Sequence, residues 1–343
     1  TDKDLSQWYL SDSTDNYFKY QFPAGTIITA GGYLVLDERD FNAGDGTADR
    51  GFLLSSLGDD LTLLSADATG QPKQFIDRVE FSATRENVSL GRLNSDDAKS
   101  ELVPQVRSTL GSSNLGQRAG DIIVSEVHYN PVELADEGLE FLELYNATGS
   151  AIELAPWRIE GGVEYELPTG VSLEAGETLV VVSFDPLTEP EKDALFRSTY
   201  GIGSEVMILG PWSEGNALDN DGERIDIVRN AEVLESGADD FAHILIDHVI
   251  YNDAESWPPA TDGQGASLHR ERAIFSGTSP SSWFSATPSP GTTELSLSPA
   301  DDFNDDGSLN ASDIDILLAA IGAETEVLDF DLDENGIVDH RDA

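Results

Sequence analysis

Short runs of apolar residues, separated by turn residues, recur along most of this chain. The runs are rich in Val, Ile, Leu, Tyr and Phe, and they lie at Tyr33–Leu36, Leu61–Leu64, Ile122–Val127, Phe141–Tyr145, Leu179–Val182 and Ile225–Val228. Runs of this length between turns are typical of strands in an all-β sandwich or barrel. We therefore predict a strand at each of these six positions.

Helical spacing appears in two further places. Residues 189–199 have the pattern of a short helix that ends at Gly201, and Ile314–Ile321 repeats apolar residues at every third or fourth position. The sequence thus predicts a mainly β protein in which helix is a minor element.

The chain repeats its own sequence. Six short blocks of the amino-terminal part recur later in the same order. The matched blocks are Leu5–Trp8 with Leu154–Trp157, Phe22–Gly25 with Leu167–Gly170, Ala30–Gly31 with Ala175–Gly176, Gly58–Leu61 with Gly222–Ile225, Ile76–Val79 with Ile246–Val249, and Ser89–Arg92 with Ser267–Arg270. Matches in one order indicate two copies of one fold, which we assign to residues 1–117 and 118–294.

The two copies differ at their start. The second has residues 121–153 ahead of its Leu-x-x-Trp block, including two strand-like runs, whereas the first has only Thr1–Asp4. The first copy is therefore expected to lack its opening strands. Two explanations stay open: a longer polypeptide was cut, or a strand from another molecule adds to the open edge, which includes homo-assembly by strand complementation.

Charge and composition exclude several classes of function. The chain of 343 residues has 19 Lys and Arg against 65 Asp and Glu, a formal net charge of −46. Such a charge repels phosphate backbones and anionic membrane surfaces, so we expect no nucleic-acid partner. No apolar run approaches the roughly 20 residues that cross a bilayer, so no membrane insertion is expected. The absence of cysteine excludes disulfides and thiolate chemistry.

Residues 301–343 differ from the rest and follow a connector rich in Ser, Pro and Thr, of which 295–300 is assigned as the linker. They contain two twelve-residue segments with oxygen-bearing side chains at positions one, three, five, nine and twelve and Gly at six. Calcium takes roughly six to eight oxygen ligands, and position seven adds a backbone carbonyl. The sequence predicts two Ca²⁺ sites, with the ligands Asp302, Asn304, Asp306, Ser308, Asn310, Asp313, Asp331, Asp333, Asn335, Ile337, Asp339 and Asp342.

The predicted loops lie in the most acidic part of the chain. Residues 301–343 carry fourteen acidic side chains and one arginine, and a helix with one apolar face is predicted between the loops. Repulsion between these carboxylates should keep the segment loose without metal. We therefore expect calcium binding to fold it.

Two details distinguish these loops from a sensor EF-hand: position twelve is Asp, and no clear entering helix precedes the first loop. In both respects the segment resembles the type I dockerin, a small α-helical, EF-hand-like module of bacterial extracellular proteins. The resemblance implies docking onto a cohesin domain, with loop positions ten and eleven contributing to partner choice. Those positions are Ala311, Ser312, His340 and Arg341. Because the two pairs differ, symmetric docking is not expected, and because the chain ends at Ala343 we assign 301–343 as a carboxyl-terminally truncated module.

The repeated copies resemble the lamin-tail domain, an immunoglobulin-like β-sandwich found in many bacterial extracellular proteins as well as in nuclear lamins. The residues that carry the resemblance are Ile123–Val127, Glu140–Asn146, Leu154 with Trp157, and Leu167–Pro168 with Gly170. The resemblance covers roughly 121–291 well and 5–111 less completely. It implies adhesion or scaffolding more than chemistry.

Other clusters of polar or aromatic residues are interpreted as structural. Glu126 and Glu143 are expected to face each other across neighbouring strands in a buried polar contact, whereas Glu140 points to the opposite face from Glu143. A plain turn is preferred to a third calcium site for Asp219, Asp221 and Glu223. His243 and His248 are interpreted as ordinary strand residues rather than as a zinc site, and Trp157, Trp257 and Trp283 as core packing rather than as a carbohydrate platform.

These observations predict two immunoglobulin-like β-sandwiches followed by a small α-helical, dockerin-like module, with no catalytic residues and no cofactor besides Ca²⁺. The expected function is that of a non-catalytic structural or adhesion segment of a large exported bacterial protein, located outside the cell or at its surface. Calcium would promote docking to a cohesin-like receptor, a sister subunit or a surface layer. The alternative is the accessory region of a secreted enzyme whose catalytic domain lies amino-terminal to Thr1.

Overall fold

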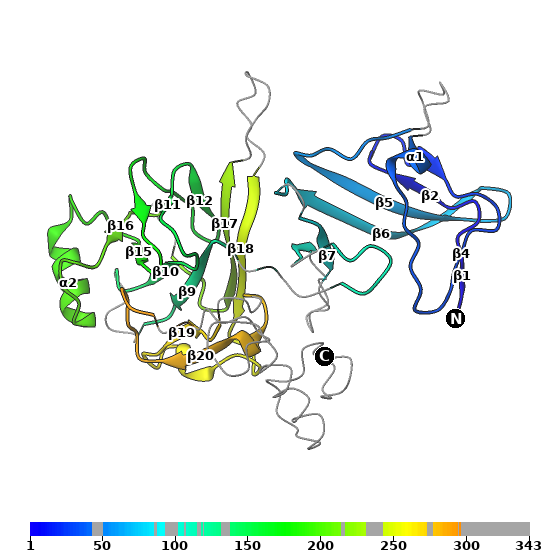
Figure 1. Cartoon of the computed structure of the whole chain (residues 1–343). Coiled ribbons are helices and arrows are strands. Elements are labelled where there is room, and N and C mark those ends of the chain that lie inside the picture. Colours follow the sequence, from blue (N-terminus) through cyan, green and yellow to red (C-terminus); the bar gives the residue numbers. More distant parts are fainter. Residues whose placement is uncertain are drawn as a thin grey trace, which may run out of the picture. The chain divides into compact units, whose positions relative to one another are not determined.

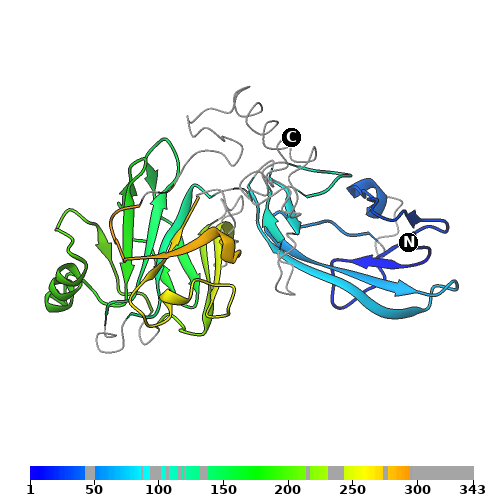
Figure 2. The same cartoon turned by 90° about the horizontal axis from the view of Figure 1, so that it is seen from below.

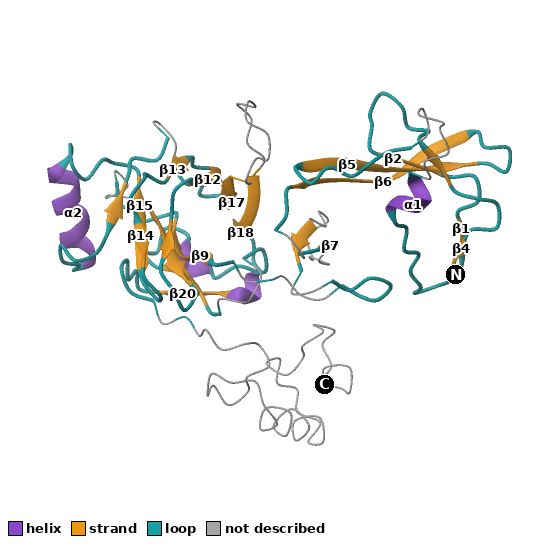
Figure 3. Cartoon of the chain, turned by 45° about the horizontal axis from the view of Figure 1, so that its top comes forward, coloured by secondary structure: helices purple, strands orange, loops and turns teal. Residues whose placement is uncertain are grey.

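The computed structural model describes residues 1–42, 51–85, 88–92, 102–105, 108–114, 118, 120–131, 138–213, 217–230, 243–272, 277–293 and 295. These residues are divided between two compact units. The first draws on residues 1–116 and 229–245, and the second on residues 117–228 and 246–343. Strands dominate both units, and helices are few (Figure 3).

Two β-sheets form the body of the second unit. Their strands are β9 (Ile122–His128), β10 (Phe141–Asn146), β12 (Trp157–Gly161), β13 (Tyr165–Glu166), β15 (Thr178–Val182), β16 (Ile208–Leu209), β17 (Gly222–Asn230), β18 (His243–Asn252), β19 (Ser267–Arg270) and β20 (Trp283–Ala286). One sheet has the order β16-β15-β10-β9-β19-β20, and the other the order β13-β12-β17-β18 (Figure 1). A short third sheet pairs β11 (Ile152–Glu153) with β14 (Ser172–Leu173). The predicted mainly β class, with an immunoglobulin-like β-sandwich, is confirmed.

The two central strands of the larger sheet are buried on both faces. Every residue of β9 and of β10 is buried. A strand that is covered on both sides has a nearly continuous apolar sequence, as in Ile122–Val124 and Phe141–Leu142, so that a polar residue within it needs internal partners.

One helix packs on this sheet. Helix α2 (Pro190–Tyr200) has Pro at its first position, acidic residues in its first turn and Arg197 in its last, each in the position that the helix dipole favours. Its Phe196 is buried in a cluster with Phe141 and Phe184. In two views α2 lies on the side of the second unit away from β17 and β18 (Figures 1 and 2). The other helical elements described are α1 (Glu38–Phe41) and the 3-10 turns η1 (Pro259–Thr261) and η2 (Pro280–Ser282), and none of the described helices has the length and apolarity to cross a membrane.

The end of α2 gives a first prediction. Gly201 follows the helix with a left-handed backbone, at a φ of 68°, and no other atom lies within 4 Å of a side chain added there. Gly201→Ala should therefore cost about 1 kcal/mol of unfolding free energy through backbone conformation alone. Gly149→Ala is the matched control, because that position is equally open without a left-handed backbone. Equal unfolding midpoints for the two variants in urea would contradict this explanation.

The first unit is built around one larger sheet. Its strands are β1 (Lys3–Asp4), β2 (Tyr9–Ser11), β3 (Tyr20–Gln21), β4 (Ile27–Ile28), β5 (Gly58–Ala66), β6 (Pro72–Ser82), β7 (Leu90–Arg92) and β8 (Leu102–Pro104). The larger sheet has the order β3-β2-β5-β6, and β1-β4 and β7-β8 form two-stranded sheets. Leu5, Trp8 and Phe22 form its small buried cluster.

Five of the six predicted strands and the helix before Gly201 are confirmed. The sixth strand prediction, at Tyr33–Leu36, is wrong: this run has no strand conformation, and Tyr33, Leu34 and Val35 are about half exposed. An apolar run becomes a strand when a neighbouring strand completes its hydrogen bonds, and none of the described strands pairs with this segment. The predicted helix Ile314–Ile321 lies outside the described residues.

Candidate functional site

A β-bulge places two carboxylates on one face of the larger sheet of the second unit. Glu126 in β9 is opposite Glu143 in β10, but the next pair joins Val124 to Leu144, so that Ser125 is an extra residue in β9. A bulge re-aims the side chains that follow it. Glu126 thereby shares the face of β10 that carries Phe141 and Glu143, which we call the α2 face because α2 packs on it. The structure thus pairs Glu126 with Glu143 on neighbouring strands, an arrangement that the sequence allowed.

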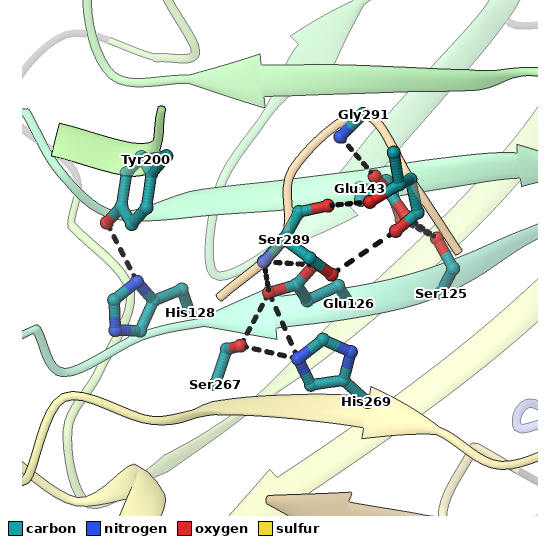
Figure 4. A network of polar contacts seen from close by, with 10 residues as sticks. Ser125, Glu126, His128, Glu143, Tyr200, Ser267, His269, Ser289 and Gly291 are labelled. Carbon is teal, nitrogen blue, oxygen red and sulfur yellow. Dashed lines mark hydrogen bonds and ion pairs between the residues drawn. The ribbon is translucent and has the colours of Figure 1, made fainter. Parts of the chain in front are cut away.

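Glu126 is held by residues of two other segments of the chain, β19 and the segment that contains Ser289. Its Oε1 atom accepts a hydrogen bond from the Ser267 hydroxyl at 2.5 Å and one from the Ser289 backbone N–H at 3.1 Å. His269 Nε2 lies 3.3 Å from the same oxygen and 2.9 Å from the Ser267 hydroxyl (Figure 4). Only 1% of the Glu126 surface is exposed.

Glu143 is bound from both sides. Its Oε1 accepts the Ser125 hydroxyl and its Oε2 accepts the Gly291 backbone N–H, both at 2.7 Å. Glu143 itself is completely buried. In Figure 4 the segment that carries Ser289 and Gly291 crosses the strands that carry the two carboxyls. Leu295 then packs against Ile123 and Tyr145, so that Ser289, Gly291 and Leu295 contact the α2 face, and we call the described residues 289–293 and 295 the strap.

Burial changes the protonation of both carboxyls. It raises the pKa of Glu126 to about 8 and that of Glu143 to about 7, despite the hydrogen bonds, which favour the ionised form. The charge of Glu143 adds to the upward shift of the pKa of Glu126. Two carboxyls this close in an apolar environment do not both ionise readily. At neutral pH the pair therefore carries at least one proton.

A buried histidine lies beside this pair on the same face. His128 Nδ1 is 2.9 Å from the Tyr200 hydroxyl, and that hydroxyl donates to the Leu139 carbonyl at 2.7 Å. Because the hydroxyl hydrogen is already used, the oxygen accepts from Nδ1–H of a neutral imidazole. Burial, together with nearby His269, lowers the pKa of His128 to about 4.

A buried ion pair binds the backbone of β9. Asp247 Oδ2 pairs with Arg270 Nη1 at 2.5 Å, and their side chains are 0% and 1% exposed. The same carboxylate accepts the Val124 N–H at 2.9 Å, and the guanidinium donates to the Val124 carbonyl at 3.3 Å. A buried ion pair needs further hydrogen bonds to offset its desolvation, and here the backbone of β9 supplies them.

The other polar clusters considered in the sequence form hydrogen bonds within the fold. Glu140 Oε2 accepts the Leu218 N–H at 2.9 Å and shares none of the hydrogen-bond partners given for Glu143. In the acidic turn, Glu223 accepts the Asp219 N–H and Asp219 accepts the Asp221 N–H, which supports the interpretation as a plain turn. Among the described residues no group of three or more His, Cys, Asp or Glu side chains is arranged to hold a metal.

The described histidines and tryptophans take structural positions. His248 is buried in β18 with Nδ1 2.5 Å from Asp226, and His243 begins the same strand. Trp157, Trp257 and Trp283 are all buried, which confirms that they pack in the core.

All predicted metal ligands, from Asp302 to Asp342, and the predicted partner residues Ala311, Ser312, His340 and Arg341 lie outside the described residues. Sequence reasoning found the two carboxylates but missed Ser267, His269 and the strap. The available signal was an ionisable residue inside each of two apolar runs, which requires partners from elsewhere in the chain. The block Ser267–Arg270 supplied two of them.

Comparisons with known proteins give one match to a family model and one to a solved structure. No curated protein matches the sequence significantly. A solved structure of a DUF4876 family protein from Bacteroides thetaiotaomicron VPI-5482 is similar at 12% sequence identity, over 83% of this chain and 92% of that one, with a TM-score of 0.34. A TM-score this low does not establish a common fold. Residues 116–232 match the family model described as Lamin Tail Domain, so that the central part of the chain, most of it in the second unit, is similar to that immunoglobulin-like family.

Proposed function

We propose that this chain is a non-catalytic structural or adhesion segment of a large exported bacterial protein, which docks or assembles through residues 301–343 when calcium is bound. Its partner is a cohesin-like receptor, a sister subunit or a surface layer, and its place of action is outside the cell or at the cell surface. The observation that carries the structural part of the proposal is the closed arrangement around Glu126 and Glu143.

These carboxyls are the most chemically distinctive groups described, and they face the protein itself. Each is hydrogen-bonded to its own chain on at least two sides, and neither presents a surface to solvent. A general acid or base must come within hydrogen-bond reach of its substrate. A sealed pair of this kind instead fixes the strap and β19 to the sheet, which favours a structural role.

The calcium part rests on the sequence of residues 301–343. Two loops with the same ligand spacing and the same Gly at position six are a far more specific pattern than a single acidic turn. Modules of this kind in extracellular proteins bind calcium weakly, with dissociation constants on the order of 0.1–1 mM. The strong acidity of the segment supports coupling between metal binding and folding.

We also propose that the first unit is a second, incomplete copy of the lamin-tail fold. The sheet β3-β2-β5-β6 contains or adjoins the same matched sequence blocks, in the same order, as the sheet β13-β12-β17-β18. Likewise β1-β4 has the place of β11-β14, and β7-β8 that of β19-β20. No described strand of the first unit takes the place of β9 and β10.

Calcium titration of the chelator-treated chain, followed by calorimetry, tests the calcium part of the proposal. We expect about two ions per chain, with dissociation constants on the order of 0.1–1 mM. A variant with Asp302→Ala and Asp331→Ala should lose both sites, because each change removes the first carboxylate ligand of its loop. The control carries Asp301→Ala and Asp329→Ala, which remove the same charge outside the predicted ligand positions.

Three results would count against it. Absence of calcium heat in the parent chain would reduce residues 301–343 to an acidic linker. Equal loss in both variants would show that calcium responds to overall charge rather than to the loops. Retention of calcium binding by the Asp302→Ala, Asp331→Ala variant would place the ions elsewhere.

A further inference from the structure

The strap covers Glu126 and Glu143, which we call the acid pair, without belonging to a sheet. Its Ser289 N–H binds Glu126 and its Gly291 N–H binds Glu143 (Figure 4). None of the described strap residues lies in a strand, whereas β9, β10 and β19, which also surround the pair, are joined by the backbone ladders of one sheet. The strap is therefore the cover that can leave the acid pair without breaking the sheet.

The acid pair has no counterion among the described residues. His269 lies 3.3 Å from Glu126, but burial lowers the pKa of this histidine, so that it is neutral near neutral pH. The buried Asp247, by contrast, is paired with Arg270. Two adjacent carboxylates in a dry site without a cation are costly. Ionisation of the second acid therefore requires that water reach the pair.

The other titratable groups around the acid pair do not offset its charge. Burial lowers the pKa of His128 in β9 to about 4 and raises the pKa of Tyr200 in α2, so that both groups are neutral near neutral pH. Glu140, just before β10, is a third acid, and Arg197 of α2 is paired with Asp193. The described strap residues are Ser, Pro, Gly, Thr and Leu, which carry no charge.

The strap fits closely against the α2 face at Gly291. This residue has a φ of 92°, and a methyl group added to it would come within 2.5 Å of the Val206 side chain. The Thr292 N–H donates to the Ser289 carbonyl at 3.0 Å, which closes a turn within the strap. The turn keeps this hydrogen bond if the strap leaves the sheet. A methyl group at Gly291 would displace the strap without altering either acid.

We propose that the strap is a proton-held latch, which lies on the sheet while the acid pair keeps at least one proton and opens when both acids are ionised. Opening lets water solvate the second charge. Burial raises the pKa of the two acids to about 7 and about 8 in the closed state, so the protons stabilise closure at lower pH, and this stabilisation is lost as the pH rises through those values. Release of residues 289–295 adds at most roughly 25 Å of extended chain ahead of residues 301–343. The inference requires neither calcium nor the proposed docking.

Thiol reactivity tests the latch, because the chain contains no cysteine of its own. In Leu295→Cys the thiol replaces the side chain by which the strap packs on the sheet. Its rate of reaction with N-ethylmaleimide is divided by that of Leu187→Cys, where the parent leucine is 91% exposed. This ratio removes the ordinary effect of pH on thiolate formation. Between about pH 6.5 and 8.5, with a chelator present, we expect the ratio to rise roughly tenfold or more.

Three further variants identify the cause of such a rise. With Glu126→Gln and Glu143→Gln added, the ratio should stay constant, because neither position can ionise. With Gly291→Ala added, the ratio should be high already at the lower pH, because the methyl group meets Val206. Val181→Cys places a thiol where the parent side chain is completely buried in β15. It should stay unreactive throughout, which separates opening of the strap from unfolding of the unit.

Two outcomes would overturn the proposal. One is a ratio that is independent of pH or that rises equally in the glutamine background. The other is a parallel rise for Val181→Cys, because the whole unit would then be opening. If Leu295→Cys reacts freely even at the lower pH, hydrogen exchange of the Ser289 and Gly291 amides in the unaltered chain decides instead. Their protection, corrected for the intrinsic effect of pH, should fall over the same interval, and constant protection would refute the latch.

Discussion

Replacing Arg270 with methionine is expected to lower the unfolding free energy of the second unit by about 3–5 kcal/mol. The change leaves the Asp247 carboxylate buried beneath β9 without its cation, and it removes the hydrogen bond to the Val124 carbonyl. Contact of the guanidinium with the Trp283 ring is lost as well. Urea unfolding, followed by tryptophan fluorescence at constant pH, measures the loss.

Two further variants identify the cause of that loss. Arg158→Met alters an exposed arginine of β12 in the same unit and should change the free energy by less than about 0.5 kcal/mol. Combining Arg270→Met with Asp247→Asn should recover part of the stability, because no uncompensated charge then remains. A loss of less than about 1 kcal/mol in Arg270→Met alone would mean that water reaches Asp247 and that the pair does not hold β9.

The second large effect concerns pH. In the unfolded chain both carboxyls ionise near their ordinary pKa of 4.5, whereas in the folded state Glu143 ionises at about 7 and Glu126 at about 8. The folded state therefore holds more protons between these values, and the free energy of unfolding falls as the pH rises through them. Between about pH 6.5 and 8.5 we expect the parent chain to lose roughly 2–3 kcal/mol from this pair.

Glutamine at both positions should remove this dependence. A variant with Glu126→Gln and Glu143→Gln keeps the shape and most hydrogen bonds but cannot ionise, so its stability should be nearly constant across the same range. Glu153→Gln, on an exposed edge of β11, is the control and should follow the parent. His128 does not disturb the comparison, because its pKa is lowered to about 4. The stability that its neutral form contributes is present above its ordinary pKa of 6.5 and is lost only as the pH falls below that value. Parallel curves for parent and double variant would show that the carboxyls are hydrated.

The sequence was most informative where a local pattern sufficed. The apolar runs of β10 and β15 and the Pro-to-Gly limits of α2 appear in the structure close to their predicted positions. The run Tyr33–Leu36 is as apolar as β15 but is not a strand. Local composition describes what a segment can form, and the presence of a neighbouring strand decides whether it does.

In the candidate site, too, local sequence pattern and tertiary structure contribute different information. The sequence showed that Glu126 and Glu143 lie within two neighbouring apolar runs and could face each other, and the strand register of the structure places them opposite. The sequence was not enough to find Gly291, whose N–H reaches Glu143 from 148 residues away in the sequence. Turns and connectors have no periodicity that indicates where they cross a sheet, and the bulge at Ser125 cannot be recognised from residue types. The partners of a buried charge therefore become visible only with the tertiary fold.

The strap also determines how tension enters this protein. A pull applied to the chain beyond Leu295 meets the second unit at the contact of Leu295 with Ile123 and Tyr145, and then at the N–H bonds to Glu143 and Glu126. The two carboxyls belong to the two central strands of the sheet, each of which is paired with a strand on both sides. The load therefore reaches the centre of the sheet and does not separate an edge strand first. A tether anchored in this way passes force to the middle of a domain, and after the Leu295 contact the next bonds to carry the load are the backbone N–H bonds to the two buried carboxyls.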